Sequence, residues 1–208
     1  MKIAIFGATG SVGRHLVDQA LIQEHEVIAV ARNPDKLEFT HPNLTRVSCD
    51  VFNADCVDDA IIGADAVLIT LGSPKLTGKI RSMGTKHIVL AMEKQGIARL
   101  ICQTTLGMGD SYENLNFFWK YIMFGLVLRM VFNDHRLQED IVRSSHLDWT
   151  IVRPSSFTDA PESGSYKQGF APEERSLSLT ISRADTAAFM LQQLTHSQYL
   201  HQAPGISN

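Results

Sequence analysis

Short apolar runs alternate with segments of helical spacing along most of the chain. The runs are mostly continuous, as expected of strands that are buried on both faces. They cover residues 2–6, 26–30, 44–49, 66–71, 98–103 and 149–153. The segments between them repeat apolar residues every three or four positions, which predicts amphipathic helices. The first such helix would carry Val12, Leu16, Val17, Ala20 and Leu21.

This alternation of strand and helix signals predicts parallel strands joined by right-handed crossovers. The fold class is therefore α/β, a doubly wound, Rossmann-type and mostly parallel sheet with helices on both faces. The 208 residues, 44% of them hydrophobic, fit one domain over residues 1–208. Small segments around residues 110–133 and 154–175 would lie on the substrate side.

The last third of the chain gives weaker signals. Residues 156–174 are rich in proline and glycine, which predicts a long loop over the ligand. Residues 176–181 alternate polar and apolar side chains, which indicates a half-exposed strand, and Ser182 is placed to cap a helix. The final dozen residues resemble a polar tail.

Three glycines, Gly7, Gly10 and Gly13, follow the first strand and open the first helix. In a dinucleotide-binding turn such glycines permit the tight bend, the close approach of the pyrophosphate and the packing of helix on strand. Amide groups and the positive dipole end of the helix then bind the phosphates. The alternative is an ordinary strand-to-helix turn without a ligand.

The end of the second strand indicates which dinucleotide is bound. NAD-binding versions carry an acidic residue there for the adenosine ribose. In this chain that position is Ala31, followed by Arg32 and, one turn later, Lys36. Basic side chains suit a 2′-phosphate, so NADP(H) is preferred over NAD(H), unless both residues are ordinary solvated turn residues.

Two further strand ends would face the same crevice, because ligands of open α/β sheets collect at the carboxyl ends of the strands. The first is Asp50 with Val51, and the second is Leu71, Gly72 and Ser73. Asp50 either accepts a hydrogen bond from the adenine amino group or caps the next helix, and the sequence favours neither role. Gly72 permits close approach of the backbone to the ribose or diphosphate.

Composition narrows the possible partners. The formal net charge is −3 without a block of like charges, which indicates a small-molecule partner rather than nucleic acid or an anionic membrane. Eight scattered histidines predict no metal site. Three cysteines without metal-ligand spacing, and an apolar start that ends in glycine without a cleavage-site pattern, indicate a cytoplasmic protein.

Residues 117–132 form the most apolar stretch of the chain. Lys120 and Arg129 interrupt it, and it is shorter than the roughly 20 apolar residues that span a bilayer, so no membrane span is predicted. We expect a helix that belongs to the core or caps the site, in preference to a subunit interface. The oligomeric state would be a monomer or a weak homo-oligomer.

Several motifs together carry a family resemblance over nearly the whole chain. They are GATGSVG at 7–13, RNP at 32–34, DV at 50–51, DAV at 65–67, TLGMGD at 105–110, DWTIVRP at 148–154 and ISRAD at 181–185. With these motifs the chain resembles the atypical short-chain dehydrogenases/reductases, in particular the branch of biliverdin-IXβ reductases and NADPH-flavin reductases. It is also similar to NmrA-like redox sensors, which bind the cofactor without turning it over.

The resemblance implies roles for individual residues. Thr9, Gly10, Ser11 and Val12 would bind the diphosphate, and Arg32 the 2′-phosphate. The nicotinamide side would be formed by Thr105 and by four consecutive residues, Pro154, Ser155, Ser156 and Phe157. The biliverdin-IXβ reductases carry a serine and a histidine where this chain has Thr105 and Ser156, its candidate catalytic residues, and the missing histidine puts biliverdin turnover in more doubt than flavin turnover. Thr105 could instead be a β-branched residue that simply packs in the sheet.

The acid/base pair of ordinary short-chain dehydrogenases is absent. That pair is a tyrosine four residues before a lysine, whereas the positions four beyond the tyrosines here hold Asn116, Gly125, Phe170 and Ala203. Alcohol or ketone chemistry, which needs a tuned acid, is therefore disfavoured. Hydride transfer to a stacked flavin or tetrapyrrole mainly needs orientation against the nicotinamide.

The sequence thus predicts an NADPH-dependent reductase of flat conjugated acceptors, with flavin (FMN or riboflavin) preferred and a biliverdin-type tetrapyrrole as the second choice. The alternative is a non-catalytic NADP(H)-binding regulator. An isomerase or epimerase is a weaker third hypothesis, since those extended relatives usually keep the tyrosine and a larger substrate region.

Overall fold

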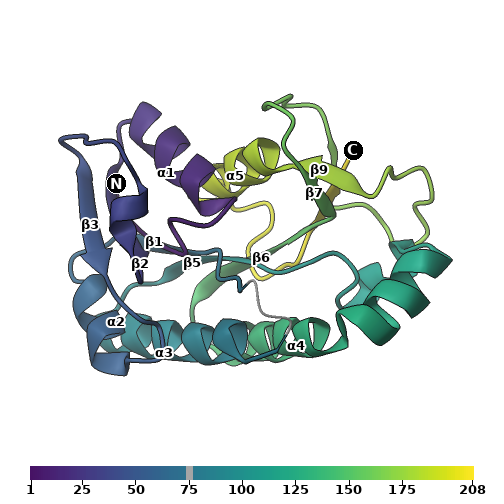
Figure 1. Cartoon of the computed structure of the whole chain (residues 1–208), viewed down its shortest axis with the longest axis horizontal. Helices are drawn as coiled ribbons and strands as arrows, with labels where there is room; N and C mark the ends of the chain where they lie inside the picture. Colours follow the sequence, from purple (N-terminus) through teal and green to yellow (C-terminus); the bar gives the residue numbers. More distant parts are fainter. Residues whose placement is uncertain (74–76) are drawn as a thin grey trace.

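The computed structural model describes residues 1–73 and 77–208, and a twisted sheet forms its centre (Figure 1). The order in the eight-stranded sheet is β3-β2-β1-β4-β5-β6-β10-β8. The strands are β1 (Lys2–Phe6), β2 (Glu26–Ala31), β3 (Leu44–Ser48), β4 (Ala66–Ile69), β5 (Arg99–Gln103), β6 (Asp148–Pro154), β8 (Lys167–Gln168) and β10 (Gly205–Ser207). All neighbours pair in parallel except β10 and β8. The doubly wound α/β prediction is confirmed.

Helices cover both faces of this sheet (Figure 1). Helices α1 (Gly13–Ile22) and α5 (Arg183–Gln192) pack against each other on one face, where the core includes Leu16 and Phe189. Helices α2 (Ala54–Ala60), α3 (Ile80–Gln95) and α4 (Arg129–Ser144) cover the other face, over a core that includes Phe6 and Met92. Strands β1, β2, β4, β5 and β6 are buried on both faces over most of their length, which explains their continuous apolar runs.

The six predicted strands of the first 154 residues are present with bounds that differ by no more than two residues. Local signals set the helix ends. The side chain of Asn53 accepts a hydrogen bond from Cys56 N at the start of α2, and Ser182 accepts one from Asp185 N at the start of α5, as predicted. Helix α3 ends at Gly96, which has φ +72°.

The end of the chain differs from the prediction of a polar tail. Strand β10 lies between β6 and β8 in the main sheet, and Ile206 and Ser207 are fully buried. The predicted strand at 176–181 is also shorter, because β9 spans Thr180–Ser182 and pairs with β7 (Ser156–Thr158) in a separate two-stranded sheet. β7 and β8 both lie where the sequence predicted a loop. Strands this short carry too few side chains for a recognisable period, and tertiary pairing alone selects them.

Residues 117–132 are not a buried helix. A 3₁₀ segment, η2 (Gly109–Asn114), leads into a π-helix, η3 (Phe118–Val127), and α4 begins directly after it. No η3 side chain is fully buried, and Phe117 and Leu126 are among the most exposed apolar residues of the protein. Trp119 and Phe124 nevertheless pack against a small cluster built on Leu106, Leu115 and Leu179. The segment therefore caps that cluster and does not belong to the main core.

The cysteines also differ from what the sequence indicated. Cys49 and Cys56 are joined in a disulfide, while Cys102 is free and buried. The cysteine content therefore gives no support to a reducing compartment, and the cytoplasmic location stays a prediction. Within residues 1–73 and 77–208, no helix combines the length and the apolar character needed to cross a membrane.

Candidate functional site

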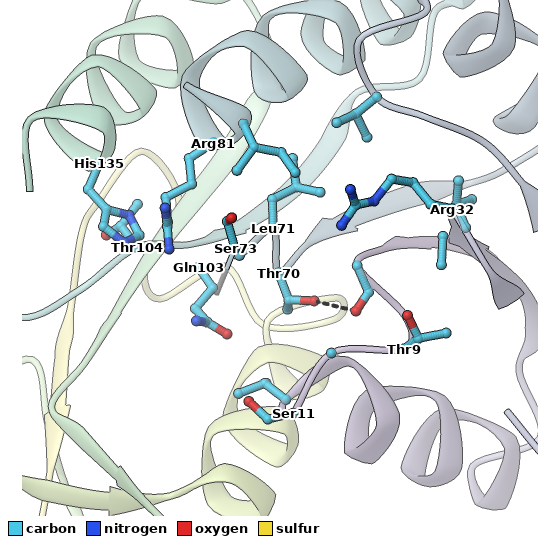
Figure 2. Close-up of a pocket in the computed structure, with 18 of the residues that line it drawn as sticks. Thr9, Ser11, Arg32, Thr70, Leu71, Ser73, Arg81, Gln103, Thr104 and His135 are labelled. Atoms are coloured by element: carbon cyan, nitrogen blue, oxygen red, sulfur yellow. Dashed lines mark hydrogen bonds between the residues drawn. The ribbon is translucent and has the colours of Figure 1, made fainter. Parts of the chain in front are cut away.

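A cleft of about 550 Å³ opens at the carboxyl ends of β1, β2, β4 and β5 (Figure 2). This edge is where open α/β sheets bind their ligands. Twelve of the predicted site residues line it: Gly7, Thr9, Gly10, Ser11, Val12, Arg32, Val51, Leu71, Gly72, Ser73, Thr105 and Phe157. The structure thus brings together residues from six separate parts of the chain.

The glycine loop connects β1 to α1 at the bottom of the cleft. Gly7 has φ +84°, and a Cβ there would approach the carbonyl oxygen of Thr70 to 2.6 Å. A Cβ on Gly13 would collide with the carbonyl oxygen of Gly7. The Thr70 hydroxyl donates to the carbonyl oxygens of Phe6 at 3.1 Å and Gly7 at 3.4 Å (Figure 2). The backbone of β1, the loop and β4 is therefore held at a close approach that side chains would prevent.

The start of α1 is suited to an anion. Among the described residues, no side chain caps this helix end. The amides of Arg14 and Leu16 already donate to the carbonyl oxygens of Gly10 and Val12, so a ligand would be held by the remaining amides of the loop and first turn. Thr9, Ser11 and Val12 line the cleft beside them. Unpaired amides and the helix dipole together favour phosphate oxygens, so the loop fits the diphosphate of a dinucleotide.

The β2 side of the cleft carries one cation. Arg32 is exposed and lines the cleft, and its carbonyl oxygen accepts from the Ser48 hydroxyl at 3.2 Å. Ala31, also in the lining, stands where an acidic residue would bind a free ribose hydroxyl. A guanidinium in this position fits a 2′-phosphate.

Five predicted cofactor residues lie outside the lining of the cleft: Gly13, Lys36 and Asp50, together with Pro154 and Ser155, which line a neighbouring cavity. Gly13 packs beneath the loop, where it allows α1 to approach β1. Asp50 is exposed and its Oδ1 accepts from Phe52 N at 3.1 Å, whereas the cap of α2 is Asn53. Asp50 therefore holds a turn and does not cap α2, whereas its hydrogen bond to the adenine amino group stays a prediction.

The opposite end of the cleft is formed by side chains from several elements. Gln103 and Thr104 come from the end of β5, Arg81 from α3 and His135 from α4 (Figure 2). The Thr104 hydroxyl donates to Glu139 Oε1 at 2.9 Å, and Glu139 pairs with buried Arg153 at 2.7 Å. The neighbouring Thr105 hydroxyl donates to the backbone carbonyl oxygen of the next residue, Leu106, at 3.3 Å.

A second, apolar cavity of about 190 Å³ adjoins this end. It shares Thr104, Thr105 and Phe157 with the cleft. The rest of its wall includes two aromatic side chains of η3 and three of the predicted site residues. The lining comprises Leu106, Leu115, Trp119, Phe124, Leu128, Pro154, Ser155, Ser156 and Leu179. The predicted nicotinamide-side residues therefore lie between a polar cleft and an apolar pocket.

His135 differs from an ordinary acid/base histidine. Burial and, to a lesser degree, the nearby positive charge of Arg81 lower the pKa of His135 to about 3. Its Nδ1 lies 3.0 Å from Gln138 Oε1. The imidazole is therefore neutral near pH 7 and shapes the cleft without donating a proton to a substrate.

Sequence reasoning missed Thr70, Arg81, Gln103 and His135 as lining residues. Gln103 and Thr70 carried a usable signal, because each lies at the end of a predicted strand on the ligand side of the sheet. Arg81 and His135 had none, since helix packing alone brings them to the cleft.

A parallel sheet in this order, with an uncapped helix after a glycine loop, defines a Rossmann-type dinucleotide-binding protein. The chain belongs to the NAD(P)H-binding family, whose model matches residues 7–197. It is similar to the UPF0659 protein YMR090W of Saccharomyces cerevisiae, with 30% identity over 207 residues that cover 94% of this chain and 88% of the yeast protein. The family assignment thus makes this chain a protein that binds a nicotinamide dinucleotide.

Solved structures agree with this assignment. The anaerobillin reductase ChuY from Escherichia coli O157:H7 matches with a TM-score of 0.80 and 26% identity, over 100% of this chain and 97% of that one. A short-chain dehydrogenase/reductase from Veillonella parvula in complex with NADP shares the fold, with a TM-score of 0.81 and 18% identity over 100% and 94% of the two chains. The fold is that of nicotinamide-dependent oxidoreductases.

Proposed function

We propose that the protein is an NADPH-dependent reductase that delivers hydride to a flat conjugated acceptor, with a flavin as the preferred class. The observation that carries this proposal is the apolar cavity that adjoins the Thr104–Thr105 end of the cleft and shares Phe157 with it. Aromatic and aliphatic walls suit a planar ring system, and a ring in this cavity would lie next to the nicotinamide end of a cofactor in the cleft.

The lining of the cleft supports a dinucleotide phosphate as the cofactor. The glycine loop and the first turn of α1 would hold the diphosphate, Arg32 the 2′-phosphate, and Leu71, Gly72 and Ser73 would flank the middle of the cofactor. The lack of an acidic residue at Ala31 supports NADPH over NADH. The bound cofactor would supply the hydride from its nicotinamide ring.

The residues beside the acceptor would position it and exclude water. Trp119 and Phe124 can stack on a ring, and Thr105 and Ser156 offer hydroxyls at the edge of the cavity. His135 is neutral and Glu139 is bonded to Arg153 and Thr104, so neither is suited to act as a general acid. Reduction of a flavin or tetrapyrrole does not need a general acid from the protein, because solvent can protonate the reduced product.

A tetrapyrrole is the second acceptor class. ChuY, the anaerobillin reductase to which this chain is 26% identical, supports it. The presence of Ser156 where biliverdin-IXβ reductases carry histidine argues for flavin first.

The test is NADPH oxidation followed at 340 nm with FMN, riboflavin and biliverdin as separate acceptors, under anaerobic conditions so that oxygen does not recycle the product. We expect turnover with the flavins and slower or no turnover with biliverdin. NADH in place of NADPH is the matched cofactor control. A protein that binds NADPH and reduces none of the three is not this reductase.

A non-catalytic NADP(H)-binding regulator remains the second candidate. The observation in its favour is the outer face of η3, where Tyr121, Ile122 and Leu126 are exposed beside Phe117. Large exposed apolar patches are typical of interaction surfaces. This function predicts tight cofactor binding without turnover.

A further inference from the structure

We propose that Arg81 binds an anionic group of the acceptor, a carboxylate or a phosphate, and so makes the enzyme selective for anionic substrates. This inference rests on the proposed reductase function and concerns the acceptor end of the same cleft. The first observation is the charge of the side chains that line the cleft. Arg32 and Arg81 are the charged residues in the described lining of the cleft, which contains neither aspartate nor glutamate.

Arg81 lies in the first turn of α3, and its side chain is only 12% exposed. Figure 2 shows the guanidinium in the cleft, between the side chains of His135 and Ser73 in this view and far from Arg32. The positive dipole end of α3 adds to the attraction for an anion at this point. The two cations thus mark opposite ends of the cleft.

Among the described residues, the Arg81 guanidinium forms an ion pair with Asp134 but no side-chain hydrogen bond of normal length. Its Nε is buried and has no hydrogen-bond partner among the described residues. The nearest carboxylate, Asp134 Oδ2, lies 3.7 Å from Nη1, which is beyond hydrogen-bond distance. The ion pair with Asp134 offsets the charge but leaves the hydrogen-bond donors of the guanidinium without acceptors, which is costly for a largely buried group, so a ligand in the cleft would supply the missing acceptor.

Asp134 is committed to a different task. Its two carboxylate oxygens accept from the backbone amides of Arg81 and Ser82, each at 3.0 Å, and from the Ser82 hydroxyl at 2.6 Å. The carboxylate therefore fixes the start of α3 and with it the position of the Arg81 backbone. Asp134 therefore fixes the backbone of Arg81 and forms an ion pair with its guanidinium, but it accepts no hydrogen bond from that guanidinium.

The anion for Arg81 comes from the acceptor, because the phosphates of the cofactor already have binding sites. In the proposed binding mode the glycine loop and α1 would hold the diphosphate, and Arg32 would hold the 2′-phosphate. Arg81 lines the end that also contains Gln103 and Thr104, which adjoins the acceptor cavity. FMN and neutral riboflavin share the same ring system and ribityl chain, and FMN alone carries a phosphate at the end of that chain, so the two flavins form a matched pair of probes.

The experiment compares wild type, Arg81→Gln and Arg81→Lys with FMN and riboflavin at saturating NADPH. For Arg81→Gln we expect the KM for FMN to rise roughly 10- to 100-fold, the range for a lost hydrogen bond to a charged group. The KM for riboflavin should change by less than about twofold, because that substrate has no anion to lose. Arg81→Lys should keep part of the preference for FMN, since it retains the charge but not the forked donors.

Lys79→Gln is the matched control. Lys79 is exposed, precedes α3 by one residue and does not line the cleft, so removing its charge should leave both KM values unchanged. Thermal unfolding of each variant shows whether it folds. The dissociation constant for NADP⁺ is measured without an acceptor and should be the same for Arg81→Gln and wild type.

Three results would overturn the inference. One is an equal effect of Arg81→Gln on FMN and riboflavin, which would make Arg81 a general packing residue. Another is a matching loss of NADP⁺ affinity, which would assign Arg81 to the cofactor diphosphate. The third concerns binding of FMN to the NADP⁺ complex, followed by flavin fluorescence: no difference between wild type and Arg81→Gln would exclude an anion site. This last measurement needs no turnover, so a failure of the reductase function is distinguished from a failure of the Arg81 assignment.

Discussion

The two ends of the cleft are built in different ways. The glycine-loop end consists mainly of backbone from one continuous segment, where Gly7 and Gly13 allow β1, α1 and β4 to meet closely. The other end consists of side chains from β5, α3, α4 and β7, held by the Thr104–Glu139–Arg153 contacts. The first end is specified by local sequence and suits a ligand of fixed structure, the dinucleotide. The second depends on tertiary packing and can vary with the acceptor.

The largest expected effect follows from breaking the backbone end. Gly7→Ala would force a side chain onto a φ of +84° and bring its Cβ to 2.6 Å from the Thr70 carbonyl oxygen. We expect the dissociation constant for NADPH to rise at least about 100-fold, because a displaced loop misaligns its amides. Isothermal titration calorimetry measures this dissociation constant. Gly63→Ala is the control, since Gly63 has φ +73° but its nearest neighbour is the Lys2 Nζ at 3.5 Å, and affinity there should not change.

At the side-chain end of the cleft, the largest effect of a substitution should be on the stability of the protein and not on cofactor affinity. Glu139 and Arg153 are both buried, and Glu139 accepts from the Arg153 Nε at 2.9 Å and Nη2 at 2.7 Å. Glu139→Gln leaves the guanidinium without its buried counter-charge, so the free energy of unfolding should fall by about 3 kcal/mol. Urea denaturation measures the free energy of unfolding of each variant. Arg143→Gln removes a more exposed partner of Glu139, at 3.4 Å, and should cost less than about 1 kcal/mol; equal losses would contradict this account.

The same contrast explains what the sequence could predict. The continuous apolar runs of β1 to β6 and the glycine spacing report local constraints, so the parallel sheet and the loop were predictable. The burial of β10 was not, because Gly205, Ile206 and Ser207 become a strand only through pairing with β6 and β8. Arg81 and His135 reach the cleft from helices whose packing leaves no trace in the spacing of residues.

The acid sensitivity of the protein should be set at the side-chain end. The pKa of His135 is lowered to about 3 in the folded state, against about 6.5 when unfolded. The unfolded chain therefore binds a proton that the folded protein does not accept, and stability is lost as the pH falls from 6.5 toward 3. Between pH 6.5 and 5 this amounts to about 2 kcal/mol. Unfolding of His135→Gln across this range should show a shallower decline than wild type, whereas exposed His146→Gln should follow wild type.

Cofactor choice is expected to depend on Arg32 alone among the basic residues of the β2 end. Arg32→Gln should raise the dissociation constant for NADPH roughly tenfold or more through the lost charged hydrogen bonds. The value for NADH should move little, because that dinucleotide has no 2′-phosphate. Lys36→Gln serves as the control, since Lys36 is exposed and outside the cleft lining. A parallel loss for NADH would show that Arg32 binds a feature common to both dinucleotides.

The smallest effect is expected at Thr105, and it distinguishes positioning from acid catalysis. The Thr105 hydroxyl donates to the Leu106 carbonyl oxygen at 3.3 Å, and the residue lines both the cleft and the apolar cavity. Thr105→Val keeps the shape and removes one modest hydrogen bond, so kcat with FMN should fall by less than about tenfold. A general acid would contribute roughly 100-fold or more. Measuring kcat from pH 6 to 9 completes the test, because loss of a required proton donor would also change the pH profile. A small, pH-independent decrease would mean that this end of the cleft works by holding the acceptor against the cofactor.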